Sequence, residues 1–154
     1  MNMLKVIIKK ILGRIIFVSG LHRLLLNKRA VIIAFHSVNK ESTASDINCT
    51  PELFRDYCEF FKRYFRVISL EELLKRMRNG DDIGGCLVIT FDDGYEDNAR
   101  IAAPILFGMN LPATFFVTSG FIGSQTIADW DAKIDIKSEW MTWDDVIEDR
   151  KSVV

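Results

Sequence analysis

Hydrophobic positions in this chain follow two alternating periods. Short apolar runs rich in β-branched residues predict strands at 30–35 ("AVIIAF"), 66–70 ("RVISL"), 86–91 ("CLVITF") and 113–118 ("ATFFVT"). The first run predicts a buried strand, and the third is continuous and apolar, as expected of a strand with both faces covered. Apolar residues at helical spacing occupy the segments between these runs. Strands that alternate with helices predict βα units and a parallel sheet, so the fold class is α/β.

Capping signals predict where several helices begin. Thr50 precedes Pro51 and Glu52, which is typical of a helix start, and Ser69 with Glu72 forms a capping box for a helix through Arg78. A helix is also expected over 96–107, and another after Thr142, which pairs with Asp145. Residues 36–48 are polar and predict a loop. The apolar stripe of the first of these helices is Leu53, Phe54, Tyr57, Phe60 and Phe61.

The N-terminal arm is basic, whereas the rest of the chain is acidic. Residues 1–40 carry eight Lys/Arg and no Asp/Glu, and the remainder carries twelve basic and twenty-one acidic residues. Residues 1–29 predict a basic amphipathic helix. One interpretation is that residues 1–28 attach to an anionic membrane surface; the other is that the helix packs on the domain with its basic side in water. The basic residues are Lys5, Lys9 and Lys10, and the apolar face holds Ile8, Ile11, Leu12 and Ile15.

Length and composition narrow the class of protein. The 154 residues favour one domain, which we place at 30–154 after the arm. The longest uncharged apolar stretch of the arm, Ile15 to Leu21, is too short for a secretory signal or a membrane span. A cytoplasmic or peripheral membrane location is therefore expected. Three cysteines without C-x-x-C spacing argue against a disulfide framework and against a thiolate zinc site.

Candidate chemistry follows two of the predicted strands. His36 comes directly after the run at 30–35, and Asp92 and Asp93 come directly after the run at 86–91. The carboxyl ends of parallel strands meet at one edge of a sheet, which is where such folds bind ligands. Adjacent carboxylates raise each other's pKa, so a chain that keeps the pair has a use for a metal ion or a proton. Tyr95 either lines this site or packs in the core.

The stretch "VITFDDGYEDN" resembles the first signature of the polysaccharide deacetylase family, the NodB-type carbohydrate esterases (type 4). The stretches "VIIAFHSV", "LPATFFVTSGFIG" and "MTWDDV" resemble further parts of that family. The resemblance covers about residues 30–148. It implies an irregular (β/α) barrel, here a partial one preceded by the amphipathic helix.

The resemblance also implies an activity and roles for the Asp pair. It suggests metal-dependent hydrolysis that removes acetyl groups from N-acetylated sugars of a polysaccharide, with zinc or cobalt as the metal. By match, Asp92 is the general base and Asp93 is a metal ligand, while His36 and Tyr95 are candidate active-site residues. The expected partner is an acetylated polysaccharide and not a nucleic acid; no substrate-binding residue is assigned.

The chain departs from the family at one motif. The family adds two metal-binding histidines from a His-(Ser/Thr)-x-x-His motif, but this sequence has only His22 and His36. Asp93 with at most His36 is too few ligands for a zinc site. We therefore expect an incomplete deacetylase domain that is truncated and inactive by itself, which a C-terminal polypeptide could complement. The alternative is a non-catalytic remnant that binds carbohydrate or another protein.

Overall fold

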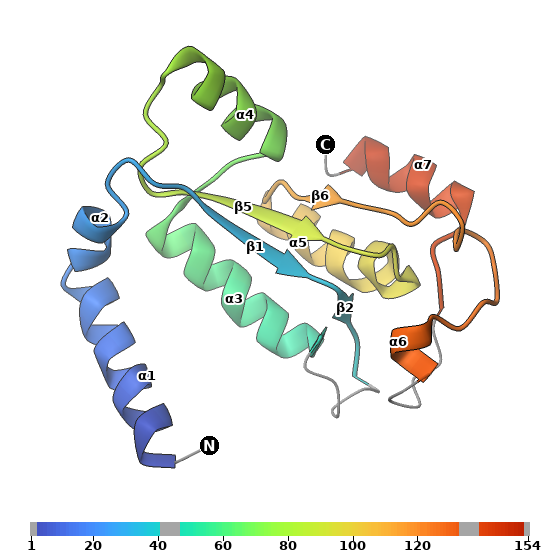
Figure 1. The fold of residues 1–154 in the computed structure, drawn as a ribbon, viewed down its shortest axis with the longest axis horizontal. Helices are drawn as coiled ribbons and strands as arrows, with labels where there is room; N and C mark the ends of the chain where they lie inside the picture. Colours follow the sequence, from blue (N-terminus) through green and yellow to red (C-terminus); the bar gives the residue numbers. More distant parts are fainter. Residues whose placement is uncertain (1–2, 41–46, 133–138, 153–154) are drawn as a thin grey trace.

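The computed structural model describes residues 3–40, 47–132 and 139–152, and Figure 1 shows the course of the chain. Strands and helices alternate along most of it, as the α/β prediction requires. The strands are β1 (Val31–Phe35), β2 (Ser37–Val38), β3 (Asn48–Cys49), β4 (Arg66–Val67), β5 (Cys86–Phe91) and β6 (Thr114–Phe115). The helices are α1 (Met3–Val18), α2 (Leu21–Leu25), α3 (Pro51–Tyr64), α4 (Leu70–Asn79), η1 (Asn98–Ala102), α5 (Ala103–Met109), α6 (Asp129–Ala132) and α7 (Trp143–Ser152).

A parallel sheet lies at the centre of the fold, and β5 is its middle strand. Strand β1 pairs with β5 from Val31↔Leu87 to Phe35↔Phe91. On the other side of β5, β4 pairs with its first residues and β6 with its last. Every one of these pairings is parallel, which confirms the predicted βα organisation. Strand β6 is shorter than the run at 113–118 had indicated.

The hydrophobic core lies between this sheet and helices α3 and α5. All six residues of β5 are buried, as the continuous apolar run predicted. The core cluster includes Phe54, Cys58 and Phe61 of α3, Leu87, Ile89 and Phe91 of β5, and Ile105 and Leu106 of α5.

Strand β1 corrects the prediction that this strand is buried. Val31, Ile33 and Phe35 pack against the core, but Ile32 is 55% exposed, and Ala34 is exposed as well. The strand is at an edge of the sheet, and among the described residues nothing buries its second face. An apolar run is compatible with a strand buried on both faces and with a strand buried on one face, so the run alone did not show which of the two applies to β1.

The predicted helix starts are confirmed by their caps. Thr50 Oγ1 accepts a hydrogen bond from the Leu53 amide at 3.3 Å, and Ser69 Oγ accepts one from the Glu72 amide at 3.1 Å. The stripe of α3 is rotated from the one expected, because Leu53 and Tyr57 are exposed whereas Cys58 is buried.

Two segments differ locally from the predictions. Residues 36–48, expected as a loop, contain the short parallel pair β2–β3, although 41–46 lie outside the described residues. The helix expected over 96–107 is divided into the π-helical segment η1 and α5. Pro104 lacks an amide proton, and its ring would clash with the carbonyl four residues earlier, so a regular α-helix cannot run through this point.

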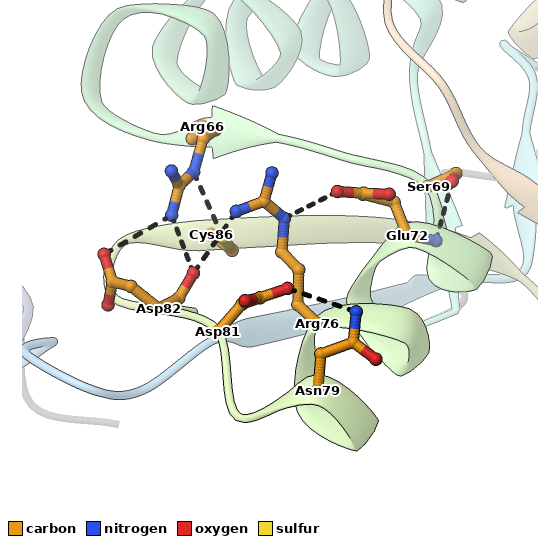
Figure 2. A network of polar contacts seen from close by, with 8 residues as sticks. All are labelled: Arg66, Ser69, Glu72, Arg76, Asn79, Asp81, Asp82 and Cys86. Carbon is orange, nitrogen blue, oxygen red and sulfur yellow. Dashed lines mark hydrogen bonds and ion pairs between the residues drawn. The ribbon is translucent and has the colours of Figure 1, made fainter.

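A polar network holds α4 against the start of β5, at the end of the sheet away from the strands' carboxyl ends. Figure 2 shows the guanidinium groups of Arg66 and Arg76 both reaching the Asp82 carbonyl oxygen, at 3.1 Å and 3.4 Å. Arg66 Nε also donates to Cys86 Sγ at 3.3 Å, and Arg76 Nε pairs with Glu72 Oε1 at 2.8 Å. These contacts tie three segments together at this end of the sheet.

No helix in the described part of the chain has the length and apolarity needed to cross a bilayer.

Candidate functional site

The carboxyl ends of β1 and β5 bring His36 and Asp92 to neighbouring positions. The last aligned pair of these strands is Phe35↔Phe91. The Asp92 amide then donates to the Phe35 carbonyl oxygen at 2.9 Å, which continues the pairing one step further. Figure 1 shows both strands ending on the same side of the sheet. The side chains of His36, Asp92 and Asp93 are all partly exposed at this edge, as the strand pattern predicted.

A row of aromatic rings forms the floor under these strand ends. Phe35 stacks on Phe91 with ring centroids 5.6 Å apart, and Phe91 stacks on Phe115 at 4.7 Å. Phe54 of α3 meets the first two rings edge-on, at 5.0 Å and 5.6 Å. Since each strand contributes one ring to the same layer, the packing fixes the relative heights of β1, β5 and β6. The Asp pair follows directly after the central ring.

Asp92 and Asp93 are held in a tight turn. The Gly94 amide donates to the Asp92 carbonyl oxygen at 3.0 Å, and Asp93 between them has φ 73°. A hydrogen bond across three residues with positive φ at the centre is the rare, strained form of γ-turn. The Thr118 amide donates to the Asp93 carbonyl oxygen at 3.2 Å and supports this conformation. Strain held by surrounding structure is characteristic of functional sites.

Gly94 is the residue that the turn requires. Its φ is +84°, and a Cβ placed there would lie 3.2 Å from the Cα of Val117. We expect Gly94→Ala to lower the free energy of unfolding by about 2–4 kcal/mol, since it combines backbone strain with a clash against main chain. Chemical denaturation of the variant and the parent chain measures this difference.

Two other glycines separate the contributions of strain and clash. Gly123 has φ +69° with open space around it, so Gly123→Ala should cost only the strain, about 1–2 kcal/mol. Gly120 has open space and no positive φ, so Gly120→Ala should change stability by less than about 0.5 kcal/mol. Equal costs for all three substitutions would argue against this account of the turn.

Asp97, which the sequence reading did not single out, anchors a polar network beside the site. Its Oδ2 accepts hydrogen bonds from Ser37 Oγ at 2.6 Å and from Asn39 Nδ2 at 2.8 Å. Asn48 joins the network through its Oδ1, which accepts from the Asn39 amide at 3.2 Å. Burial raises the pKa of the Asp97 carboxyl, while the hydrogen bonds from Ser37 and Asn39 lower it in part. The network ties the segment after His36 to the segment after Asp93.

The pKa of Asp97 predicts a pH-dependent contribution to stability. A carboxyl whose pKa is raised in the folded state favours folding at low pH, and this contribution is lost as pH rises through the folded-state pKa. We therefore expect Asp97→Asn to gain stability relative to the parent chain between about pH 4 and pH 7. Urea denaturation at several pH values measures the difference.

Asp97→Ala is the matched comparison for this effect. It removes the carboxylate that accepts hydrogen bonds from Ser37 Oγ and Asn39 Nδ2, which then keep only Asn48 Oδ1 and Ser37 Oγ as acceptors, and this loss costs about 1–3 kcal/mol at any pH. A constant difference between Asp97→Asn and the parent chain across the pH range would count against the assigned pKa direction.

The candidate residue Tyr95 and the second histidine of the chain, His22, both lie in aromatic packing. Tyr95 is 5% exposed and stacks on Trp140 with ring centroids 4.8 Å apart. This matches the packing alternative, and an active-site role for Tyr95 stays a prediction. His22 is 4% exposed and packs against Phe17, Tyr64 and Phe65. Phe65 precedes β4, which pairs with the start of β5, so His22 lies at the opposite end of the sheet from Asp92.

The described residues do not by themselves make a metal site. Within 3–40, 47–132 and 139–152, no group of three or more His, Cys, Asp or Glu side chains is arranged to hold a metal ion. A zinc site needs three protein ligands and an open position. Asp93 and His36 offer two donors at most, so the donor set does not fit a closed metal site without further ligands.

The comparisons with known proteins came from sequence and from structure. The family model described as polysaccharide deacetylase matches residues 79–150, and no curated protein matches the chain. The fold is similar to that of IcaB from Ammonifex degensii, with a TM-score of 0.67 and 21% identity over 80% of this chain and 48% of that chain.

Two further solved structures have a similar fold. A de-N-acetylase from Aggregatibacter actinomycetemcomitans aligns with a TM-score of 0.64 and 21% identity, over 81% of this chain and 52% of that chain. The Streptococcus pyogenes deacetylase PplD, solved with acetate, aligns with a TM-score of 0.61 and 19% identity, over 80% of this chain and 53% of that chain. The chain thus spans about half the length of the structures that it resembles. The expected partial NodB-type fold is confirmed.

Proposed function

We propose, since the polysaccharide deacetylase family model matches residues 79–150, that the chain supplies the Asp pair of an enzyme that removes acetyl groups from N-acetylated polysaccharide. The observation that carries the proposal is the turn at Asp92–Asp93. It sets two carboxylates at the carboxyl ends of parallel strands, beside His36, in a conformation that costs stability.

The two carboxylates are proposed to have different roles. Hydrolysis of an N-acetyl group adds water across the amide bond and yields acetate and a free amine. Asp92, partly exposed at the strand end, accepts the proton of the attacking water as general base. Asp93 is proposed as a ligand of a divalent cation, zinc or cobalt, because the resemblance of the Asp pair to the family's first signature implies this role. When bound with a complete ligand set, such a cation supplies an acidified water and polarises the acetyl oxygen.

Further ligands are proposed to come from another polypeptide segment. The described residues lack a three-donor group, and the chain spans about half of the similar structures. Strand β1 also lies at an edge of the sheet, where the described strands pair with it only on its β5 side. An uncovered edge strand is a surface on which additional strands can pair. We propose that a C-terminal polypeptide with the two-histidine motif pairs here and completes the barrel and the site.

The test is acetate release by the completed site. The chain is combined with a C-terminal polypeptide that carries the two-histidine motif, and N-acetylglucosamine oligomers serve as substrate. Activity is expected to fall by about 10²–10⁴-fold in Asp92→Asn and in Asp93→Asn. Asp56→Asn, on an exposed position of α3, is the matched control and should leave activity unchanged. A folded complex without activity, or one indifferent to both site substitutions, would reject the proposal.

A non-catalytic role is the second candidate, favoured by the lack of a three-donor group among the described residues. In that case the chain binds acetylated oligosaccharide or a protein partner without cleaving it. Calorimetric titration with N-acetylglucosamine oligomers distinguishes the two candidates. Saturable binding without acetate release, both alone and in the complex, would support the binding role.

A further inference from the structure

Helix α1 turns its apolar stripe towards solvent instead of packing it on the domain. Ile8, Ile11, Leu12, Ile15 and Val18 recur at three- and four-residue spacing, so they share one face. Each of these side chains is between 47% and 69% exposed. Figure 1 shows α1 at the margin of the molecule, its N-terminal end diverging from α3. An exposed stripe of this kind marks an interaction surface.

The opposite side of α1 is the one attached to the body. Phe17 contacts Phe60 with ring centroids 4.7 Å apart, Tyr64 at 5.4 Å and Phe65 at 5.8 Å. With about 100° of rotation per residue, Phe17 lies about 160° around the helix from Ile15. The contacts that hold α1 in place therefore leave the apolar stripe free. Helix α1 therefore packs on the domain through Phe17 with its basic side chains in water, while its apolar stripe stays exposed.

Basic side chains border the stripe on both sides. Lys5 and Arg14 lie next to the stripe, one on each side, and Lys9 and Lys10 lie one step further around the helix at four-residue spacing from them. All four are exposed, and residues 1–40 contain no acidic residue. Long basic side chains beside an apolar face can extend to lipid phosphates while the face enters the acyl boundary.

We propose that α1 is an interfacial helix that docks the chain on a bilayer containing anionic lipids, with its axis in the plane of the surface. The side chains of Ile8, Ile11, Leu12 and Ile15 enter the acyl boundary, and the four basic residues contact headgroup phosphates. A second copy of the chain fits this surface less well, because two such stripes would bring their basic borders together. This proposal concerns attachment and is independent of the proposed activity.

Vesicle flotation of the full chain tests the charge requirement. The chain should bind vesicles of phosphatidylcholine mixed with phosphatidylglycerol and bind pure phosphatidylcholine much less. Each basic residue near an anionic surface contributes about 1 kcal/mol, so the double variant Lys9→Gln and Lys10→Gln should lower partitioning about 30-fold. The matched control, Lys75→Gln with Arg78→Gln on exposed positions of α4, should change it by less than about two-fold.

Substitutions in the stripe test the orientation of the helix. Ile11→Ser with Ile15→Ser should lower partitioning by about ten-fold or more, since two buried side chains are lost from the acyl boundary. Met77→Ser with Phe107→Ser, exposed apolar positions outside α1, should have little effect. A dye on Ile11→Cys should report an apolar environment only with anionic vesicles; the three native cysteines are buried and do not compete for label.

Three results would overturn the proposal. The first is equal binding to neutral and anionic vesicles, and the second is no binding to either. The third is dimerisation of the chain in lipid-free buffer that Ile11→Ser abolishes, which would assign the stripe to a second copy.

Discussion

The purified 154-residue chain, supplied with Zn²⁺ or Co²⁺, should release acetate from N-acetylglucosamine oligomers several orders of magnitude more slowly than the completed complex. Among the described residues, Asp93 and His36 are the candidate metal ligands near the turn, and His22 is held among aromatic rings at the other end of the sheet. A cation held by so few ligands binds weakly. Because each catalytic group contributes about 10²–10⁴-fold, the loss of several groups together is expected to remove measurable turnover.

An enzyme-coupled acetate assay measures the rate, and calorimetric titration with Zn²⁺ measures the affinity for the metal. Asp93→Asn serves as the control in the isolated chain, where it should not lower the rate further. Robust metal-dependent turnover by the isolated chain that Asp93→Asn abolishes would contradict the incompleteness of the site while supporting the proposed chemistry. In the complex, the same substitution is expected to cause a large loss of activity. The two measurements together therefore distinguish the incompleteness of the isolated site from the proposed chemistry.

Features with a local cause were predicted from the sequence. Strand β5 was predicted because six consecutive apolar residues fit a strand covered on both faces. The starts of α3 and α4 were predicted because Thr50 and Ser69 satisfy amides three residues further on. The neighbouring positions of His36 and Asp92 were predicted by adding one rule to the strand pattern, namely that the carboxyl ends of parallel strands lie at a common edge of the sheet.

Features that depend on distant contacts were not predicted. Ser37 and Asn39 meet Asp97 across about sixty residues of chain, and nothing in either segment indicates its partner. The only local signal for Asp97 was its own position, since it is acidic and lies four residues after Asp93, close enough to be on the same side of the fold. The exposure of Ile32 similarly depends on what packs over β1, which no pattern within the strand records.

Helix α1 combines both situations. Its period predicted a stripe of apolar residues and a basic border, but the period does not say which side faces the domain. That was decided by Phe17, a single aromatic residue off the stripe that fits among the rings of α3. The contact of Phe17 with α3 is on the face opposite the stripe, and it leaves the stripe exposed. This exposure is the observation on which the membrane interpretation rests.

Phe91→Ala should be among the most destabilising single substitutions in the chain, lowering the free energy of unfolding by about 3–5 kcal/mol. Phe91 has no exposed surface, and it contacts the rings of Phe35, Phe54 and Phe115 at 4.7–5.6 Å. Removing it opens a cavity in the layer that sets the heights of three strands. Since domains are stable by about 5–15 kcal/mol, this loss is a large fraction of the total. Urea denaturation followed by circular dichroism measures it.

Phe107→Ala is the matched control, because it removes the same atoms from a ring that is 67% exposed on α5. Its cost should stay within about 0.5 kcal/mol. Phe91→Leu keeps most of the buried volume and should recover a substantial part of the loss. Similar costs for Phe91→Ala and Phe107→Ala would show that the aromatic floor does not determine stability. A large cost for Phe91→Ala, together with recovery by Phe91→Leu, would support the view that the packing of this ring stabilises the strand end that carries the Asp pair. Asp92 follows Phe91 directly in the chain.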